Sequence, residues 1–265
     1  MSSEVKIPKT IHYIWFGGKP LPPMAERCIS SWKEHCPDYE IVRWDEDNFD
    51  SGGNRYFEEA LAAKKWAFAS DYARLKVLVE HGGIYMDTDV EVLHPLDRFL
   101  EEDAFSGFET PSRISTGLMA CRRSFPLFER LLRDYEGRAF VLSDGSYDET
   151  TNVVAITNAC LELGLELNGG KQTVEGFALY PKDYFPPKDH KTRQVHLTEN
   201  TYVIHHFDGT WLPDETVAYK HAKERLIAAH PKMPYSFASG LALLGLCIEA
   251  GSMKPYKVWT ENRGR

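Results

Sequence analysis

The sequence predicts an α/β fold, in which a parallel sheet is flanked by helices. Strand-like and helix-like segments alternate over the first hundred residues, which is the pattern of such a sheet. The chain has 265 residues and is 43% hydrophobic, which is enough apolar material for a substantial core and excludes a disordered chain. This length fits one large domain, or a domain with an appended subdomain.

The alternation of strand-like and helix-like segments is clearest in the first half of the chain. Short runs rich in β-branched and aromatic residues predict strands at residues 10–15, 39–44 and 84–86. Helix-like segments lie between these strands, at residues 22–36, 55–63 and 65–80. The pair Gly82-Gly83 is expected to end the last of these helices, because glycine commonly terminates helices.

The second half is less regular. Further strands are predicted at residues 104–109, 117–121 and 201–206, and further helices at residues 125–135, 151–163 and 214–229. The proline-rich segment 177–190 is predicted to be a loop. The apolar stretch 237–250 is too short for a membrane-spanning helix, which needs about 18–20 residues.

Charge and cysteine content narrow the functional class. Lys and Arg total 31 and Asp and Glu total 39, a net charge of −8, and this acidic balance argues against a nucleic-acid-binding role. The N-terminus lacks the apolar stretch of a signal peptide. The five cysteines are scattered and form no C-x-x-C pair, so a reduced, cytoplasmic setting is the simplest expectation.

The most informative segment is the Asp87-Thr88-Asp89 sequence that follows the apolar strand 84–86. In an extended chain, residues two apart point to one side, so Asp87 and Asp89 would present two carboxylates together. Oxygen ligands of this kind suit Mg²⁺ or Mn²⁺ bridging to substrate phosphates. An aspartyl phosphatase also uses D-x-D after a strand, but Glu91 stands where such enzymes need a small residue.

Three other features each have two interpretations. Asp71 and Arg74 share a helix face. They form either a surface ion pair or a pair that binds sugar hydroxyls through hydrogen bonds. His205 and Trp211 in the segment HHFDGTW are either a metal ligand and an aromatic that offers a flat face and one N–H donor, or buried core residues. Trp15 either belongs to the core or stacks on a nucleobase at the sheet edge.

Three blocks of the sequence resemble glycosyltransferase family 32. These blocks are IPKTIHYIWFGG, KKWAFASDYARLKVLVEHGGIYMDTDV and YVIHHFDGTW, and together they span residues 7–211. The resemblance implies a GT-A-type nucleotide-sugar-binding fold with a mixed central sheet flanked by helices. It also implies a D-x-D motif that assists a divalent metal, Mn²⁺ or Mg²⁺, and retention of configuration at the transferred sugar. Residues 1–230 would then form the catalytic domain, and residues 231–265 an extension that packs on it or contacts a membrane.

The resemblance also implies roles for single residues on the donor side. Trp15 would stack on the base, with Tyr13 and Ile14 lining the same pocket. The S-D-x-x-R positions, Ser70, Asp71 and Arg74, would contact the donor sugar or its ribose, and Tyr85 would border the nucleotide. Thr116 stands where relatives often carry Asn, and Thr210 stands where they commonly carry Ser before Trp211, which would bind the diphosphate.

The metal ligands follow from the same resemblance. Asp89 would bind the metal directly, whereas Asp87 would contact ribose and sugar hydroxyls or a water on the metal. His205 would be the C-terminal ligand, with the neighbouring His206 as the alternative. The implied function is transfer of a hexose from UDP-galactose or UDP-glucose, with GDP-mannose also found among relatives, to a glycan or a lipid-linked glycan. The first rival function is a non-catalytic nucleotide-sugar or glycan-binding module, and the second, which ranks lower, is a metal-dependent phosphatase. Membrane contact would be at most peripheral, at the inner membrane face.

Overall fold

A computed structural model describes residues 4–189, 193–210, 212, 214–230, 232–250, 252 and 254–261. The chain divides into two compact units. The sheet unit comprises Met1–Pro187 and His196–His206, and the helical unit comprises Lys188–Val195 and Phe207–Arg265. That residues 1–230 act as the catalytic domain stays a prediction.

The sheet unit is built on a mixed sheet. Its strands follow the order β2-β1-β3-β7-β5-β9-β8, with β6 attached to β5. Their bounds are β1 Thr10–Ile14, β2 Glu40–Trp44, β3 Gly83–Met86, β5 Ala104–Thr110, β6 Arg113–Ile114, β7 Leu118–Cys121, β8 Gln172–Val174 and β9 Phe177–Tyr180. Strands β2, β1 and β3 are parallel, whereas β7 runs antiparallel to both β3 and β5. The expected mixed central sheet is therefore confirmed.

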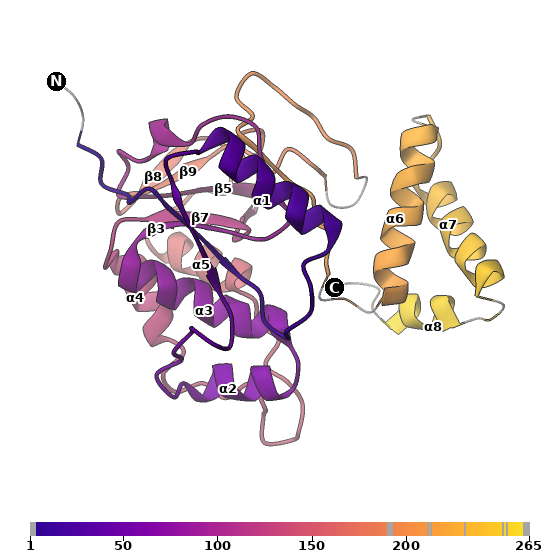
Figure 1. The fold of residues 1–265 in the computed structure, drawn as a ribbon, viewed down its shortest axis with the longest axis horizontal. Helices are drawn as coiled ribbons and strands as arrows, with labels where there is room; N and C mark the ends of the chain where they lie inside the picture. Colours follow the sequence, from indigo (N-terminus) through magenta and orange to yellow (C-terminus); the bar gives the residue numbers. More distant parts are fainter. Residues whose placement is uncertain are drawn as a thin grey trace. The chain divides into compact units, whose positions relative to one another are not determined.

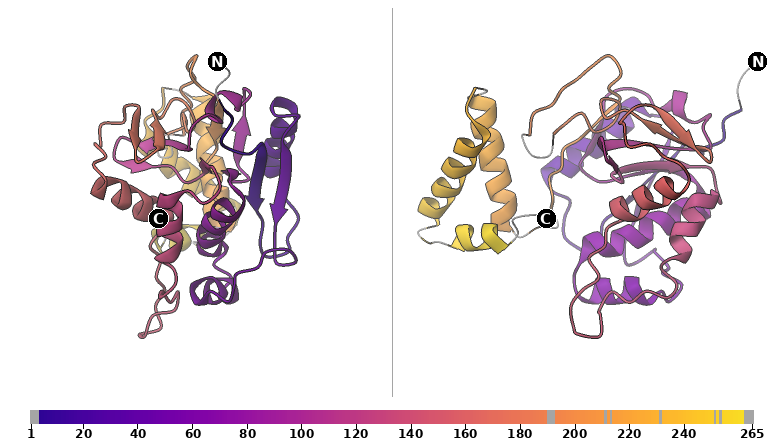
Figure 2. Two further views of the ribbon diagram at one scale, coloured as in Figure 1. Left: turned by 90° about the vertical axis from the view of Figure 1, so that its left-hand side faces the viewer. Right: turned by 180° about the vertical axis from the view of Figure 1, so that it is seen from behind.

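Helices flank this sheet (Figures 1 and 2). Their bounds are α1 Pro23–His35, α2 Arg55–Ala62, α3 Trp66–His81, α4 Pro126–Arg133 and α5 Asn152–Glu162, with a short 3₁₀ turn at Asp97–Phe99. One apolar cluster contains buried residues of α2 to α5, and a second contains buried residues of α1. Tyr85 of β3 belongs to the first cluster, whereas its neighbours Ile84 and Met86 belong to the second, as the alternation of side chains along a strand requires.

The start of β3 depends on two glycines. Gly82 ends α3 with φ of 69°, and Gly83 opens β3 with φ of 97°. A Cβ atom on Gly83 would lie 2.7 Å from the carbonyl oxygen of Thr10 in β1. Glycine alone allows this backbone conformation and this close approach, so the Gly-Gly pair fixes where the strand bearing the D-x-D motif begins.

One sequence prediction is corrected by this fold. The segment 177–190 was expected to be a loop, but its first residues form β9, paired in parallel with β5. The prolines begin only at Pro181, so they end the strand instead of preventing it. The segment after the D-x-D motif is a separate strand, β4 (Val90–Val92), which pairs antiparallel with β10 (Val203–His205).

The helical unit contains α6 (Asp214–Ala229), α7 (Tyr235–Glu249) and α8 (Lys254–Glu261). Its small core is formed by Tyr219, Ala242 and Leu243, against which Leu226 and Trp259 pack. The bounds of α6 coincide with the predicted helix 214–229. Among the described residues, no helix is both long enough and apolar enough to cross a membrane.

Candidate functional site

The D-x-D motif lies in a tight turn at the end of β3. Asp87 follows the last residue of the strand, and its backbone N–H donates to the carbonyl of Gly117 at 2.8 Å. The chain then turns back, and the N–H of Val90 donates to the carbonyl of Asp87 at 3.0 Å. The two aspartates were expected to share one side of an extended chain, but it is this turn that places them.

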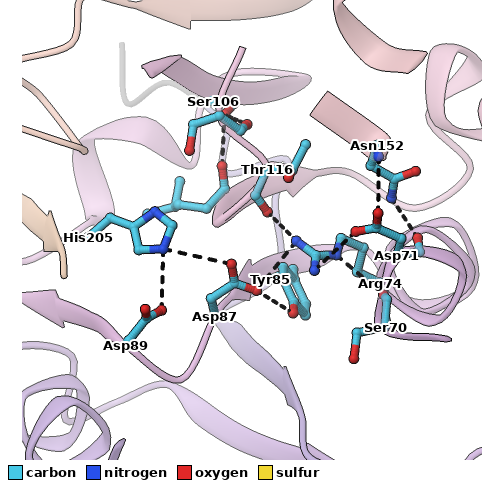
Figure 3. A network of polar contacts seen from close by, with 12 residues as sticks. Ser70, Asp71, Arg74, Tyr85, Asp87, Asp89, Ser106, Thr116, Asn152 and His205 are labelled. Atoms are coloured by element: carbon cyan, nitrogen blue, oxygen red, sulfur yellow. Dashed lines mark hydrogen bonds and ion pairs between the residues drawn. The ribbon is translucent and has the colours of Figure 1, made fainter. Parts of the chain in front are cut away.

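His205 joins the two aspartates because β10 pairs with β4. In this pairing His205 lies opposite Val90, the residue that follows the motif. Its Nε2 atom lies 3.3 Å from Oδ1 of Asp89 and 3.9 Å from Oδ2 of Asp87. One ligand atom from each of these three residues falls within 4.8 Å of the others. Residues more than a hundred positions apart thus form one cluster (Figure 3).

Gly117 makes room for this histidine. A Cβ atom built on Gly117 would lie 2.5 Å from Cε1 and 2.6 Å from Nδ1 of His205, and 3.2 Å from Oδ2 of Asp87. Any side chain there would displace the imidazole or the carboxylate. Sequence analysis did not single out Gly117, since nothing in its local sequence indicates that a strand from residue 203 onwards lies against it.

The carboxylates control the charge of His205. Burial disfavours its charged form, but Asp89 and Asp87 outweigh burial and raise the pKa of His205 above its usual value. A bound cation would replace the proton as the partner of the two carboxylates. Two carboxylates and an imidazole are a donor set that suits Mn²⁺ or Mg²⁺, so the residues present fit the expected metal.

His206, the alternative ligand, has another partner. Its Nε2 lies 2.7 Å from Oε2 of Glu91 in β4, and its backbone N–H donates to the carbonyl of Asp89 at 2.9 Å. Among the described residues, the cluster of possible metal ligands contains His205 and not His206. The geometry therefore favours His205.

Arg74 is the centre of the adjoining polar network (Figure 3). One guanidinium nitrogen donates to the carbonyl of Thr116 at 2.7 Å and lies 3.4 Å from Oδ1 of Asp87. The other terminal nitrogen lies 3.3 Å from Oδ1 of Asp71. The guanidinium also stacks on the ring of Tyr85, with 4.5 Å between its central carbon and the ring centroid.

Asp71 and Arg74 are not a surface pair. Asp71 is 7% exposed and Arg74 is 6% exposed, so the interpretation as a solvated ion pair is wrong. Burial raises the pKa of Asp71 although Arg74 opposes this effect. A buried pair of this kind depends on each partner to compensate the other's charge.

Asp71 also holds the start of α5. Its Oδ2 accepts a hydrogen bond from the backbone N–H of Asn152 at 3.0 Å, and its carbonyl accepts one from Nδ2 of Asn152 at 2.6 Å. The Asn152 side chain in turn accepts from the hydroxyl of Tyr135 at 2.8 Å. Asn152 was missed by sequence analysis, because it lies 81 positions from Asp71 and only the fold brings them together.

Tyr85 and Thr116 lie beside this network as expected, but they contribute different groups. The hydroxyl of Tyr85 donates to Oδ1 of Asp87 at 2.7 Å. Thr116 contributes its carbonyl oxygen to Arg74, as does Ser70, whose carbonyl accepts from Nε of Arg74 at 3.2 Å. The hydroxyl of Ser106 lies 2.8 Å from the carbonyl oxygen of Ser115 and 2.7 Å from that of Leu118, so its one proton can be donated to either and ties this segment to β5.

The remaining donor-side residues are spread over other parts of the chain. Tyr13 packs edge-on against Trp32 in one apolar cluster, and Ile14 belongs to the other cluster, so the two side chains face opposite sides of the sheet. Trp15 is half-buried and donates to the carbonyl of Lys19 at 2.6 Å. Thr210 is an exposed turn residue of the helical unit, and Trp211 lies outside the described residues. The predicted donor contacts of these five residues stay predictions.

Part of the chain is similar to known proteins. Residues 22–106 match the family model described as a glycosyltransferase sugar-binding region containing a DXD motif. A curated relative, inositol phosphoceramide mannosyltransferase 3 of Schizosaccharomyces pombe, is 28% identical over 143 residues, which is 52% of this chain. The chain spans only 40% of the length of that relative.

Two glycosyltransferases are among the solved structures that match part of this chain. The PaToxG glycosyltransferase matches 59% of this chain and 68% of its own, at 20% identity and a TM-score of 0.44. The galactosyltransferase LgtC, solved in complex with donor and acceptor sugar analogs, matches 85% of this chain and 97% of its own, at 15% identity and a TM-score of 0.43.

The matched sugar-binding region contains Asp71, Arg74, Asp87 and Asp89. The region therefore includes the D-x-D turn and the buried pair of Asp71 and Arg74, whereas Thr116, Asn152 and His205 of the same site lie beyond it. Over residues 22–106 the chain is similar to the DXD-containing sugar-binding region of glycosyltransferases.

Proposed function

We propose that this chain is a metal-dependent hexosyltransferase that moves a sugar from a nucleotide-sugar donor to a glycan or lipid-linked glycan. One observation carries the proposal: Asp87, Asp89 and His205 converge within 4.8 Å at the end of a sheet strand. Ligands of open α/β sheets commonly bind outside the carboxyl ends of the strands, and β3 delivers Asp87 and Asp89 at its carboxyl end.

Asp87, Asp89 and His205 would together hold Mn²⁺ or Mg²⁺. When bound, such an ion neutralises the negative charge that develops on a departing diphosphate. Asp89 and His205 provide one carboxylate and one imidazole, and the turn from Asp87 to Val90 fixes the spacing between the two carboxylates. The chain itself is acidic, with a net charge of −8, so carboxylates alone would repel a diphosphate.

Arg74 would act beside this cluster. Its guanidinium is held by the carbonyls of Ser70 and Thr116 and lies against Asp87 and Asp71. In this position it orients Asp87 and places fixed positive charge near the donor. Such preorganised charge lowers the barrier because it needs no rearrangement during the reaction.

The donor sugar and the stereochemistry are finer proposals. The resemblance to family 32 favours retention and a UDP-hexose, either UDP-galactose or UDP-glucose. The name of the S. pombe relative specifies a mannosyltransferase, which makes mannose the competing sugar. We propose the UDP-hexose first and mannose as the alternative that a donor panel must include.

The acceptor proposal has support from the same relative. Its name specifies inositol phosphoceramide, a lipid that carries a polar headgroup. A lipid-linked glycan acceptor for this chain would agree with that precedent, and a free glycan is the other option within the proposal.

The test is a donor panel with and without metal. UDP-galactose, UDP-glucose and GDP-mannose are incubated with the full chain in Mn²⁺, in Mg²⁺ and in EDTA, and release of nucleotide is measured. We expect one donor to be hydrolysed slowly, with the metal required. NMR of the anomeric proton in the transferred product then tests retention.

The outcomes separate the rival functions. A nucleotide-sugar-binding module would bind a donor and release no nucleotide, which would overturn the proposal of catalysis. A phosphatase would cleave a generic phosphomonoester such as p-nitrophenyl phosphate. Full activity in EDTA would overturn the proposed metal dependence.

A further inference from the structure

An exposed apolar stripe runs along α7 in the helical unit. It consists of Phe237, Leu241, Leu244 and Ile248, whose exposed fractions are 59%, 37%, 57% and 70%. Their spacing of four, three and four residues places them within a sector of roughly 60° on the helix. We refer to these four side chains as the α7 stripe. Large apolar side chains gathered in this way on a surface indicate a binding face.

The opposite side of α7 is already occupied. Ala238, Ala242 and Leu243 are buried, and they lie on the far side of the helix from the α7 stripe. Figure 1 shows α7 lying alongside α6, with α8 across one end of the pair. Because α7 packs on α6 and α8 through that side, the stripe is not needed for the core of the unit.

The composition of α7 is unusual for a surface helix. Glu249, the last residue of α7, is the only charged residue of this helix. It is exposed, and helical geometry places it away from the α7 stripe. A surface helix normally carries charged residues on its outer face. An outer face of Phe, Leu and Ile, bordered by the exposed tyrosines Tyr235 and Tyr256, is typical of a helix that lies in a lipid interface.

Lysines flank the α7 stripe at both ends. Lys232 lies just before α7 and Lys257 lies in α8 just after it, and both are exposed. Lys254, also in α8, forms an ion pair with Glu215. Residues 207–265 carry eight Lys and Arg against six Asp and Glu, whereas the whole chain carries 31 against 39. The helical unit is therefore the basic part of an acidic protein, and basic residues beside an apolar face attract anionic lipids.

We propose that the α7 stripe and its flanking lysines dock the protein onto the surface of a membrane containing anionic lipids. A second copy of the chain is the less suitable occupant. Four side chains fall far short of the roughly 20–30 residues a side in a stable interface, and a symmetric dimer would bring the same lysines together. Docking does not depend on the proposed transfer reaction, although it would bring the enzyme to a lipid-linked acceptor.

The test is co-sedimentation of the full chain with vesicles. One set contains phosphatidylcholine alone, and the other contains phosphatidylcholine with one third phosphatidylglycerol. We expect binding to the anionic vesicles, weaker binding to the neutral ones, and loss of the difference in high salt. Failure of the wild-type chain to sediment with anionic vesicles would overturn the proposal.

Two variants test the two parts of the surface. The double variant Phe237→Ser with Ile248→Ser should lower binding to anionic vesicles at least tenfold and leave the melting temperature unchanged, because both side chains are exposed. A double variant in which Lys232 and Lys257 become Gln should lower binding to anionic vesicles by about fivefold per lysine and leave binding to neutral vesicles unchanged.

The matched control replaces exposed leucines of the sheet unit. Leu142 and Leu161 are 42% and 40% exposed, and the double variant Leu142→Ser with Leu161→Ser should bind vesicles as the wild type does. Equal loss in the control and in the α7 variant would overturn the assignment to α7. Light scattering without vesicles tests whether a second copy of the chain binds the α7 stripe instead. If the wild type were a dimer that the α7 variant dissociates, and if it did not bind vesicles, the stripe would be a protein interface and the proposal would be overturned.

Discussion

The two halves of the polar network at the end of β3 differ in how far the protein itself satisfies them. Around Arg74, the side chains of Arg74 and Asp71 are 7% and 10% exposed, and they bind each other and backbone groups. Around His205, the side chains of Asp87 and Asp89 are 28% and 15% exposed, and their oxygens face an imidazole at 3.3 to 3.9 Å. The first half is closed and the second is open to a ligand.

This difference assigns different roles to residues of similar chemistry. Asp71 and Asp89 are both aspartates of the site, but Asp71 is bound on one side by Arg74 and on the other by the start of α5. Its carboxylate therefore fixes the position of Arg74, which in turn holds Asp87. Asp89 lies at the end of this sequence of contacts, where a cation and a diphosphate can reach it. The closed half fixes the positions of the side chains, and the open half contains the carboxylates and the imidazole that we propose bind the metal.

The largest expected effect comes from breaking the closed half. Replacing Arg74 by Ala leaves Asp71 buried without its countercharge, so we expect the free energy of unfolding to fall by about 3–5 kcal/mol. Turnover should fall as well, since Asp87 loses the guanidinium 3.4 Å from its Oδ1. Chemical denaturation and donor turnover measure the two effects. An unchanged free energy of unfolding would show that the closed half does not stabilise the fold.

In the open half we expect a substitution to lower turnover without lowering stability. Replacing Asp89 by Asn removes a charge from the proposed metal ligands but keeps the size of the side chain. We expect donor turnover to fall on the order of 10²–10³-fold with the melting temperature maintained. The control is Asp47→Asn, an exposed aspartate after β2, which should change neither quantity. Wild-type turnover in the stable Asp89 variant would refute a role for this carboxylate.

A substitution at Gly117 tests whether the protein holds His205 in position for the metal. A methyl group at this position would meet His205 at 2.5 Å, so Gly117→Ala should displace the imidazole. Loss of such a precise fit typically lowers metal affinity by about 10–100-fold, which Mn²⁺ titration by calorimetry would measure. Gly137 is the matched control, because a Cβ atom there meets nothing within 4 Å. Equal Mn²⁺ affinity in the two alanine variants would show that the close fit between Gly117 and His205 does not matter for metal binding.

Sequence analysis predicted most of the sheet unit because local signals and fold agree there. The strand 84–86 and the helix 65–80 are nearly the observed β3 and α3, since the Gly-Gly pair marks their junction by backbone conformation alone. The proline-rich segment 177–190 was misread at its start. Its prolines follow β9, and the pairing of β9 with β5 is a long-range contact that local composition does not reveal.

The sequence predicts the D-x-D motif of the candidate site but not the residues that hold this motif in place. Asp87 and Asp89 were identified from two carboxylates beyond an apolar strand, although a turn and not an extended chain brings them together. The burial of Asp71 and Arg74 was missed, because helical spacing gives their shared face but not what covers it. Asn152 and Gly117 act through contacts across 81 and 88 positions of sequence, and no spacing rule connects such residues.

The smallest expected effect comes from His12, a buried histidine of β1 that can be compared with His205. His12 in β1 donates from Nε2 to the carbonyl of Gly82 at 2.9 Å and accepts at Nδ1 from Trp44 at 3.2 Å. Burial lowers its pKa from 6.5 to about 4, whereas carboxylates raise the pKa of His205. Because unfolded His12 takes up a proton near pH 6.5 and folded His12 does not until about pH 4, the free energy of unfolding should fall as the pH drops between these values, by about 1–2 kcal/mol from pH 7 to pH 5. Denaturation across this range, compared with His12→Gln, measures the effect, and the gap between the two proteins should narrow towards pH 4. A gap that is constant with pH would mean that His12 does not titrate differently in the two states.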